Sequence, residues 1–349
     1  MTRRRSMSTV ALAAVAALLI SAAPAAAAGE SYVALGDSYS SGTGTRSYIS
    51  DGTSCLRSVY AYPSLIASAK GYALNFRACS GAKIADVTTS QLSALTSSTA
   101  YVSISVGGND AGFSSVLTTC AQPAWLSNCT AAIDRAQSYI RNTLPGQLTT
   151  LYAAIRARAP QATVTVVGYP RLFNGVDCNL LTWFSSTEMS RLNATADLLN
   201  ATTSGRATAT GFTFANPTTP FLGHAVCSSS EWINGLSSPT NESYHPNRAG
   251  HSSGYTPTVS PYLTGSTVVA TAAVLTTAKG SATRLADQQR TYAAVDSTIE
   301  PETVLAPDLS TPQARAAAAR AGVDLSSRAS IDAVDRLYAA REAAAFARR

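Results

Sequence analysis

The chain has 349 residues, of which 46% are hydrophobic and 13% are charged, and its formal net charge is +6. This length suffices for one large domain, or for one domain with an appendage. Three of the positive charges belong to Arg3, Arg4 and Arg5, in a segment expected to be removed. The remaining bias is too slight to indicate nucleic acid as a partner.

The first 28 residues are organised like an export signal. A basic start, MTRRRSMS, precedes the apolar run TVALAAVAALLI and a small-residue tail with an Ala-x-Ala site ending near Ala28. The apolar run is short for a membrane span, and no later segment approaches a spanning length. We therefore expect residues 1–28 to be a signal peptide and the mature protein to be secreted, without a transmembrane segment. Adjacent arginines suggest the twin-arginine route, but the rest of that signature is missing, which favours general secretion.

Short β-branched runs then alternate with amphipathic stretches. The expected strands are residues 32–35, 72–76, 101–107, 163–169 and 211–216. The expected helices are residues 62–70, 84–95, 131–159 and 186–204, and Pro145 should kink or break the third. This alternation predicts an α/β fold with a parallel sheet of about five strands and helices on both faces. In such folds, chemistry gathers in the loops beyond the carboxyl ends of the strands.

The amino-acid composition of the sequence changes after Gly265. Strand signals and cysteines stop, and Ala, Arg and Asp become frequent. Thr311, Pro312 and Gly322 have the positions of an N-cap, a first helical residue and a helix terminator, and a second helix is expected from Ser330. We expect residues 266–349 to be a linker with a weakly amphipathic helical extension of unknown role.

The chain contains six cysteines. An even number in an exported protein indicates three disulfides, although the sequence alone does not choose the pairing. Cys120 and Cys129 enclose a short loop and form the most plausible local pair. A metal site is the alternative, but there is no C-x-x-C and no nearby pair of histidines.

Several polar segments could carry chemistry. Ser38 lies in GDSYS, directly after the first expected strand, and Asn109 lies in GGND, directly after the third. A serine nucleophile needs a base and donors for the oxyanion. His245 in YHPN could be the base, and Gly81 in SGAK and the Asn109 amide could supply donors. Taken singly, each segment is explained equally well as a turn or a surface loop.

Together and in this order, the four segments resemble the GDSL, or SGNH, hydrolase family over residues 31–265. The resemblance implies that the signature residues are Ser38, Gly81, Asn109 and His245. The export signal, the cysteine layout and the phrase VALGDSYSSG are similar to the secreted lipases, esterases and phospholipases of filamentous actinobacteria. This implies a flavodoxin-like, three-layer α/β/α catalytic domain over residues 29–265. It also implies sequential disulfides, namely Cys55–Cys79, Cys120–Cys129 and Cys178–Cys227.

The resemblance also implies the roles of these residues. Ser38 would attack an ester carbonyl, and His245 would accept its proton and return it to the leaving alcohol. The backbone N–H groups of Ser38 and Gly81 and the side-chain amide of Asn109 would hold the oxyanion. No metal or other cofactor is implied, and we expect a monomer. Asp37 and Asp110 are expected to fix their loops by accepting backbone N–H bonds.

The third member of the triad departs from the family pattern. The wider family has an Asp three residues before the histidine, where this chain has Glu242. In the actinobacterial relatives a backbone carbonyl two residues before the histidine can replace the acid, which here is Ser243. Both remain candidates, with a preference for the Ser243 carbonyl.

The function that the sequence favours is hydrolysis of carboxylic esters of lipids, by a triacylglycerol lipase, a phospholipase A1 or a carboxylesterase. The exposed apolar loop NLLTWFSS, residues 179–186, would suit an acyl chain. A deacetylase or feruloyl-type esterase acting on carbohydrate esters is the alternative, because the same residues could serve it. A non-catalytic secreted binding module is the alternative from another class.

Overall fold

The computed structural model describes residues 2 and 29–348. Apart from Thr2, the expected signal peptide lies outside the described residues. Five parallel strands form one sheet in the order β2-β1-β3-β4-β5, which confirms the predicted α/β class. The strands are β1 Ser31–Gly36, β2 Ala73–Phe76, β3 Tyr101–Ser105, β4 Thr163–Val167 and β5 Thr213–Ala215.

The order of the strands in the sheet reverses beside β1. This strand pairs with β2 on one side and β3 on the other, so that Tyr32 lies opposite both Leu74 and Tyr101. The chain runs from β1 to β2 at one edge and returns to the other side of β1 as β3. Open α/β sheets bind ligands beyond the carboxyl ends of strands at such a reversal. The loops after β1 and β3 are therefore where a site is expected.

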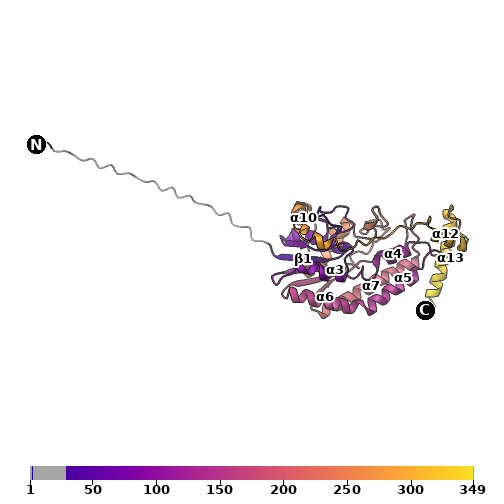
Figure 1. The fold of residues 1–349 in the computed structure, drawn as a ribbon, viewed down its shortest axis with the longest axis horizontal. Helices are drawn as coiled ribbons and strands as arrows, with labels where there is room; N and C mark the ends of the chain where they lie inside the picture. The colour runs from indigo at the N-terminus through magenta and orange to yellow at the C-terminus, as the bar shows by residue number, and fades with distance from the viewer. Residues whose placement is uncertain (1, 3–28, 349) are drawn as a thin grey trace.

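Helices cover both faces of the sheet. Helices α2 and α8 pack against each other and against strands, while α3, α6 and α7 form a second layer, of which α6 and α7 lie at the bottom of Figure 1. Residues such as Leu35 and Ile104 are fully buried between the layers. The elements up to Gly265 are α1 Ser38–Ser41, α2 Tyr62–Lys70, α3 Ile84–Thr89, η1 Gln91–Ala94, α4 Phe113–Cys120, α5 Cys129–Asn142, α6 Leu144–Arg158, α7 Ser186–Ala209, η2 Thr240–Glu242, η3 Gly250–Tyr255 and α8 Thr256–Thr264.

Two predicted helices are divided in the structure. The stretch 131–159 forms α5 and α6, which meet at Thr143 because Pro145 lacks a backbone N–H and therefore occupies the first turn of α6. The stretch 84–95 ends as a helix at Thr89 and continues as the single turn η1.

The segment after Gly265 is mostly helical where a linker is expected. Helices α9 Ala272–Gly280, α10 Ala282–Arg290 and α11 Ala293–Asp296 come first, and α9 packs against α2 while α10 packs against β2. Small alanines and a few buried residues such as Leu285 make these contacts, so that no strong apolar period marks them in the sequence. The domain boundary at residue 265 stays a prediction.

Residues 297–311 have no regular secondary structure and lead to α12 Pro312–Ala321 and α13 Arg328–Phe346. As expected, Thr311 caps α12 by accepting from the Ala314 N–H, and Gly322 ends it. These two helices lie at one end of the molecule in Figure 1. Apolar side chains of these helices and of their connection, including Ile331 and Val323, form a cluster with Trp125 that is separate from the main core.

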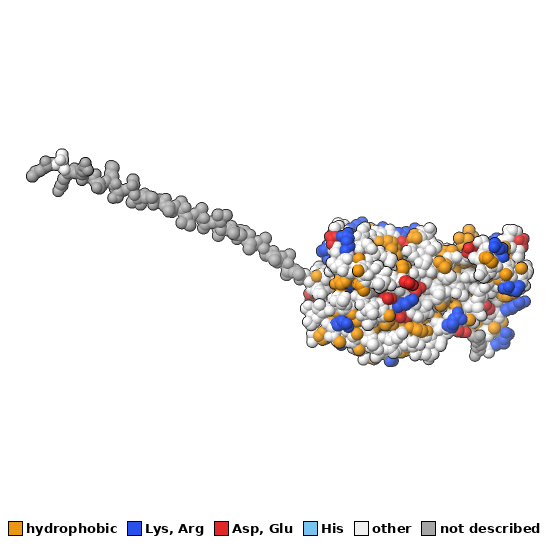
Figure 2. Space-filling model, in the orientation of Figure 1, with side chains coloured by type: hydrophobic (Ala, Val, Ile, Leu, Met, Phe, Trp, Pro, Cys, Tyr) orange, Lys and Arg blue, Asp and Glu red, His pale blue; other side chains and the backbone are white. Residues whose placement is uncertain are grey.

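The surface carries charges of both signs, interspersed over the face drawn in Figure 2. Several Lys and Arg side chains lie along the end formed by α12 and α13. Among the described helices, none has both the length and the apolar character needed to cross a membrane.

Three disulfides are present in the structure. They join Cys55 to Cys79, Cys120 to Cys129 and Cys178 to Cys227, the sequential pairing that the family resemblance implies.

Candidate active site

Ser38 opens helix α1 directly after β1. Asp37 precedes it as the N-cap, with Oδ1 accepting from the Tyr39 N–H at 3.0 Å. The Asp37 N–H in turn donates to the Ser105 carbonyl of β3 at 3.0 Å. These bonds fix the turn, so that the Ser38 hydroxyl is held at the carboxyl edge of the sheet, where its residue is 4% exposed.

His245 lies beside Ser38 although 207 residues separate them in the sequence. Its Nε2 is 2.8 Å from Ser38 Oγ. The backbone is fixed on both sides, because the His245 carbonyl accepts from the Asn234 N–H at 2.9 Å and the Tyr244 carbonyl accepts from the Tyr39 hydroxyl at 2.7 Å. The spacing of Nε2 and Oγ is that of a hydrogen-bonded base and nucleophile.

The other ring nitrogen of His245, Nδ1, lies 2.9 Å from the Ser243 carbonyl oxygen. A carbonyl only accepts, so Nδ1 carries the proton and Nε2 faces Ser38 as an acceptor. The Glu242 carboxylate points elsewhere: it accepts from the Tyr48 hydroxyl at 2.5 Å and pairs with Arg46 Nε at 3.4 Å. Of the two orienting candidates, the structure brings the Ser243 carbonyl to the imidazole.

The protonation of His245 follows from its burial. Desolvation lowers the pKa of the imidazole to about 4, and the bond to the Ser243 carbonyl offsets this only in part. The ring is therefore neutral at neutral pH, which is the form that can accept a proton from Ser38.

Gly81 and Asn109 stand on the two loops that flank Ser38, after β2 and β3. The Asn109 side-chain amide donates to the Ala82 carbonyl at 3.0 Å, which ties these loops together. Gly81 adopts φ +86°, a conformation that glycine tolerates and other residues rarely adopt. Asn109 is 5% exposed. The loops thus bring the predicted donors to the same rim as the nucleophile.

Asp37 anchors a hydrogen-bond network that the sequence reveals only in part. Its local bond to the Tyr39 N–H is the predicted turn role, but Oδ1 also accepts from the Ser105 hydroxyl at 2.7 Å and Oδ2 from the Tyr169 hydroxyl at 2.5 Å. Burial raises the pKa of this carboxyl to about 6. Ser105 lies in β3 and Tyr169 lies just after β4, and no local signal in the sequence identifies them as its partners.

Asp110 has the comparable role on the next loop. Both of its carboxylate oxygens accept from the Ile84 N–H at 3.2 Å, which fixes the start of α3. Burial raises the pKa of Asp110 to about 6. Like Asp37 it accepts a backbone N–H, as predicted, but the donor lies 26 residues away and not in the loop of Asp110 itself.

An apolar pocket has Tyr39 and Gly108, the sequence neighbours of Ser38 and Asn109, in its lining. Rings of the site form one end of it: Phe113 lies 5.7 Å and Tyr39 5.3 Å, centroid to centroid, from the His245 ring. Beyond them the pocket is lined mainly by aliphatic side chains of α4, α5 and α7, including Leu117, Ile140 and Leu199. A chain of methylene groups fits these surroundings better than a sugar does.

One group of described residues has the spacing of a metal site, namely Cys178, Cys227 and Glu231. The two thiols are joined in a disulfide, and the Glu231 carboxylate accepts from the Cys227 N–H at 2.5 Å. The disulfide bond accounts for the short distance between the two sulfur atoms, and a disulfide sulfur is not the thiolate that binds a metal ion.

Sequence comparison supports what this geometry suggests. The model of the GDSL-like Lipase/Acylhydrolase family matches residues 34–252, which include Ser38, Gly81, Asn109 and His245. Lipase 1 of Streptomyces coelicolor is 46% identical over 257 residues, covering 72% of this chain and 94% of that protein. A lipase of Streptomyces rimosus is 47% identical over 228 residues, covering 65% of this chain and 84% of that protein.

Two solved structures are also similar. The extracellular lipase of Streptomyces rimosus superposes with a TM-score of 0.62 at 45% identity, covering 66% of this chain and 98% of its own. The phospholipase A1 of Streptomyces albidoflavus gives a TM-score of 0.62 at 42% identity, with the same coverage of 66% and 98%.

Proposed function

Since the chain belongs to the GDSL-like lipase/acylhydrolase family, we propose that it is a secreted serine hydrolase that cleaves carboxylic esters of lipids through a Ser38–His245 pair. The observation that carries this proposal is the 2.8 Å contact between His245 Nε2 and Ser38 Oγ, with Nδ1 held by the Ser243 carbonyl at 2.9 Å. A neutral imidazole in this tautomer is ready to act as a general base.

In the acylation half-reaction, Ser38 Oγ attacks the ester carbonyl carbon while Nε2 takes the hydroxyl proton. The tetrahedral intermediate then collapses, the C–O bond to the alcohol breaks, and His245 returns the proton to the leaving alcohol. The Ser243 carbonyl stabilises the imidazolium that forms between these steps and keeps the ring in register. In the second half-reaction, water attacks the acyl-enzyme with His245 as base, which releases the fatty acid and restores Ser38.

The oxyanion of each intermediate is held by the N–H of Ser38, the N–H of Gly81 and the amide of Asn109. One such donor contributes about 3 to 4 kcal/mol to lowering the barrier. Asn109 is pre-positioned by its bond to the Ala82 carbonyl, which leaves the second amide hydrogen for the substrate.

Two features favour lipid esters over carbohydrate esters. The pocket that includes Tyr39 and Gly108 is lined mainly by apolar side chains. In the predicted apolar loop, Leu180 and Leu181 are 81% and 60% exposed, while Phe184 is buried in the core. The similar Streptomyces enzymes are lipases and a phospholipase A1, which supports the same assignment.

Secretion rests on the expected signal peptide and on the three disulfides, which persist in oxidising compartments. The similar Streptomyces rimosus enzyme is an extracellular lipase.

A substrate panel tests the proposal. Long-chain triacylglycerol, phosphatidylcholine and acetylated xylan are offered to the wild type and to Ser38→Ala. We expect turnover of one or both lipids by the wild type and its loss in the variant. Turnover of acetylated xylan alone would establish the carbohydrate esterase, and no turnover of any ester would leave a binding module.

A further inference from the structure

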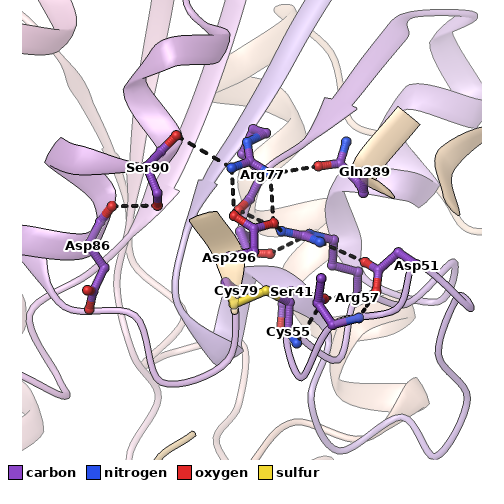
Figure 3. The surroundings of a disulfide bond; sticks show 12 residues. Ser41, Asp51, Cys55, Arg57, Arg77, Cys79, Asp86, Ser90, Gln289 and Asp296 are labelled. Carbon is purple, nitrogen blue, oxygen red and sulfur yellow. Dashed lines mark hydrogen bonds and ion pairs between the residues drawn. A yellow bond between two sulfur atoms is a disulfide. The ribbon is translucent and has the colours of Figure 1, made fainter. Parts of the chain in front are cut away.

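Asp296, the last residue of α11, is fully buried, although it lies in a segment that the sequence predicts to be a linker. It lies between two arginines that are also fully buried: it accepts from Arg57 Nη2 at 2.5 Å and from Arg77 Nη1 and Nη2 at 2.9 and 2.7 Å. Figure 3 shows its carboxylate between the two guanidinium groups, beside the Cys55–Cys79 disulfide. Asp296 lies beyond residues 34–252, which match the family.

The two arginines hold the backbone that leads to Gly81. Arg57 Nε donates to the Ala78 carbonyl at 2.9 Å and its Nη2 to the Arg77 carbonyl at 3.4 Å. Arg77 Nη2 donates to the Ser90 carbonyl at 3.4 Å, which joins the segment to the turn before η1. The guanidinium groups therefore fix the path of residues 77–79, between β2 and the Gly81 turn.

The charges in this cluster balance. Asp51 accepts from Arg57 Nη1 at 2.6 Å, so that two carboxylates face two guanidinium groups. Gln289 of α10 satisfies a further N–H of Arg77 at 2.9 Å, and the Tyr292 ring lies 3.8 Å from its Cζ. Removing the Asp296 charge leaves an excess buried cation that must move to find solvent or another acceptor.

The chain beyond Asp296 continues across the Gly81 turn. Ile299 is buried in a cluster with Cys55, Cys79 and Ala82. The Glu300 carbonyl oxygen approaches Gly81 so closely that a Cβ added there would lie 2.2 Å from it. Glu302 then pairs with Lys83 Nζ at 2.9 Å. One stretch of the C-terminal segment thus reaches the Gly81 turn in two ways. Asp296 acts on it through the two arginines, and residues 299–302 contact it directly.

We propose that Asp296 is a positioning residue for ester hydrolysis: it holds Arg57 and Arg77 so that the Gly81 turn presents its N–H to the oxyanion. The inference rests on the proposed function. If it holds, α11 and residues 297–302 support the position of an oxyanion donor, whereas the sequence alone suggests only a linker. Misplacing a catalytic group by about 1 Å is enough to reduce the rate about 100-fold.

The test compares Asp296→Asn with Asp287→Asn in the full chain. Asp287 lies on the neighbouring helix α10 and pairs with Arg290 at the surface, so it undergoes the same chemical change without burial. Steady-state kinetics use a soluble short-chain ester, at a temperature where circular dichroism shows both variants folded. We expect Asp296→Asn to lose about tenfold or more in kcat, with KM within about twofold of wild type. Phosphonylation of Ser38 slows by the same factor, and Asp287→Asn behaves like wild type.

A second variant covers the case in which Asp296→Asn does not fold. Ile299→Ala changes no charge and loosens only the packing of the C-terminal segment on the disulfide and Ala82. A kcat reduced about threefold or more at unchanged KM supports the inference, because a purely stabilising role would not change kcat in folded protein.

A folded Asp296→Asn with wild-type or increased kcat would overturn it, as would a change in KM alone. If the wild type itself neither hydrolyses esters nor reacts at Ser38, the proposed function has failed instead.

Discussion

The Ser243 carbonyl oxygen lies 2.9 Å from His245 Nδ1, in the position where a serine triad usually has a carboxylate. The nearest acidic residue in the sequence, Glu242, binds Tyr48 and Arg46 instead. A backbone carbonyl carries a partial charge and cannot be protonated, so it orients the ring at every pH at which the protein is folded.

The first prediction concerns Glu242. Glu242→Gln should lose less than about tenfold in kcat, or about 1.4 kcal/mol of barrier, because the carboxylate does not contact the imidazole. Steady-state kinetics on a soluble ester measure this. Tyr48→Phe is the matched control, since it removes the same hydrogen bond from the other partner. A loss approaching the ~10⁴-fold seen when a triad carboxylate is neutralised would show that Glu242 orients His245 after all.

The second prediction concerns pH. Burial lowers the pKa of His245 to about 4, and only the neutral ring can accept the Ser38 proton. As the pH falls through about 4 the ring becomes protonated, so kcat/KM should stay level from pH 7 downward and drop only near that value. A midpoint near 6.5, the ordinary pKa of histidine, would contradict this.

A control separates His245 from its neighbour Asp37, whose pKa burial raises to about 6. In Asp37→Asn, the decrease in kcat/KM near pH 4 should persist, because it comes from protonation of the His245 imidazole.

The third prediction concerns the acyl pocket. Ala196 on α7 lines it, whereas Ala194 on the same helix is exposed. Ala196→Trp should fill the pocket and lower kcat/KM for a long-chain ester by about tenfold or more relative to a short-chain ester, since each lost methylene contact is worth about 0.8 kcal/mol. Ala194→Trp should leave the ratio unchanged. If both variants keep the wild-type chain-length preference, the acyl chain binds elsewhere.

Much of this site could be predicted because its signals are local. Ser38, Gly81, Asn109 and His245 each stand in a short polar segment, and two of these segments directly follow predicted strands. A parallel sheet brings the ends of its strands to one rim, which predicts that Ser38 and Asn109 lie on the same edge. Gly81 and His245 were added by the family resemblance that the four segments carry together.

The contacts that support the site could not be predicted in the same way. Asp296 is one acid in an alanine-rich stretch, and its partner Arg77 lies 219 residues earlier. An ion pair over that distance leaves no periodic pattern. The same holds for the Tyr169 hydroxyl on Asp37, 132 residues away, and for the apolar pocket, whose lining comes from several helices.

In the proposed mechanism, Ser38 is the nucleophile and His245 activates it. The most direct measurement is mass spectrometry of the wild type and His245→Ala after exposure to a serine-reactive phosphonate ester, with ester turnover followed in parallel. We expect one adduct on the peptide that contains Ser38, loss of turnover in proportion to labelling, and labelling of His245→Ala slowed by about 10³-fold or more. An unlabelled Ser38 in a protein that still hydrolyses esters, or equal labelling of both proteins, would contradict it.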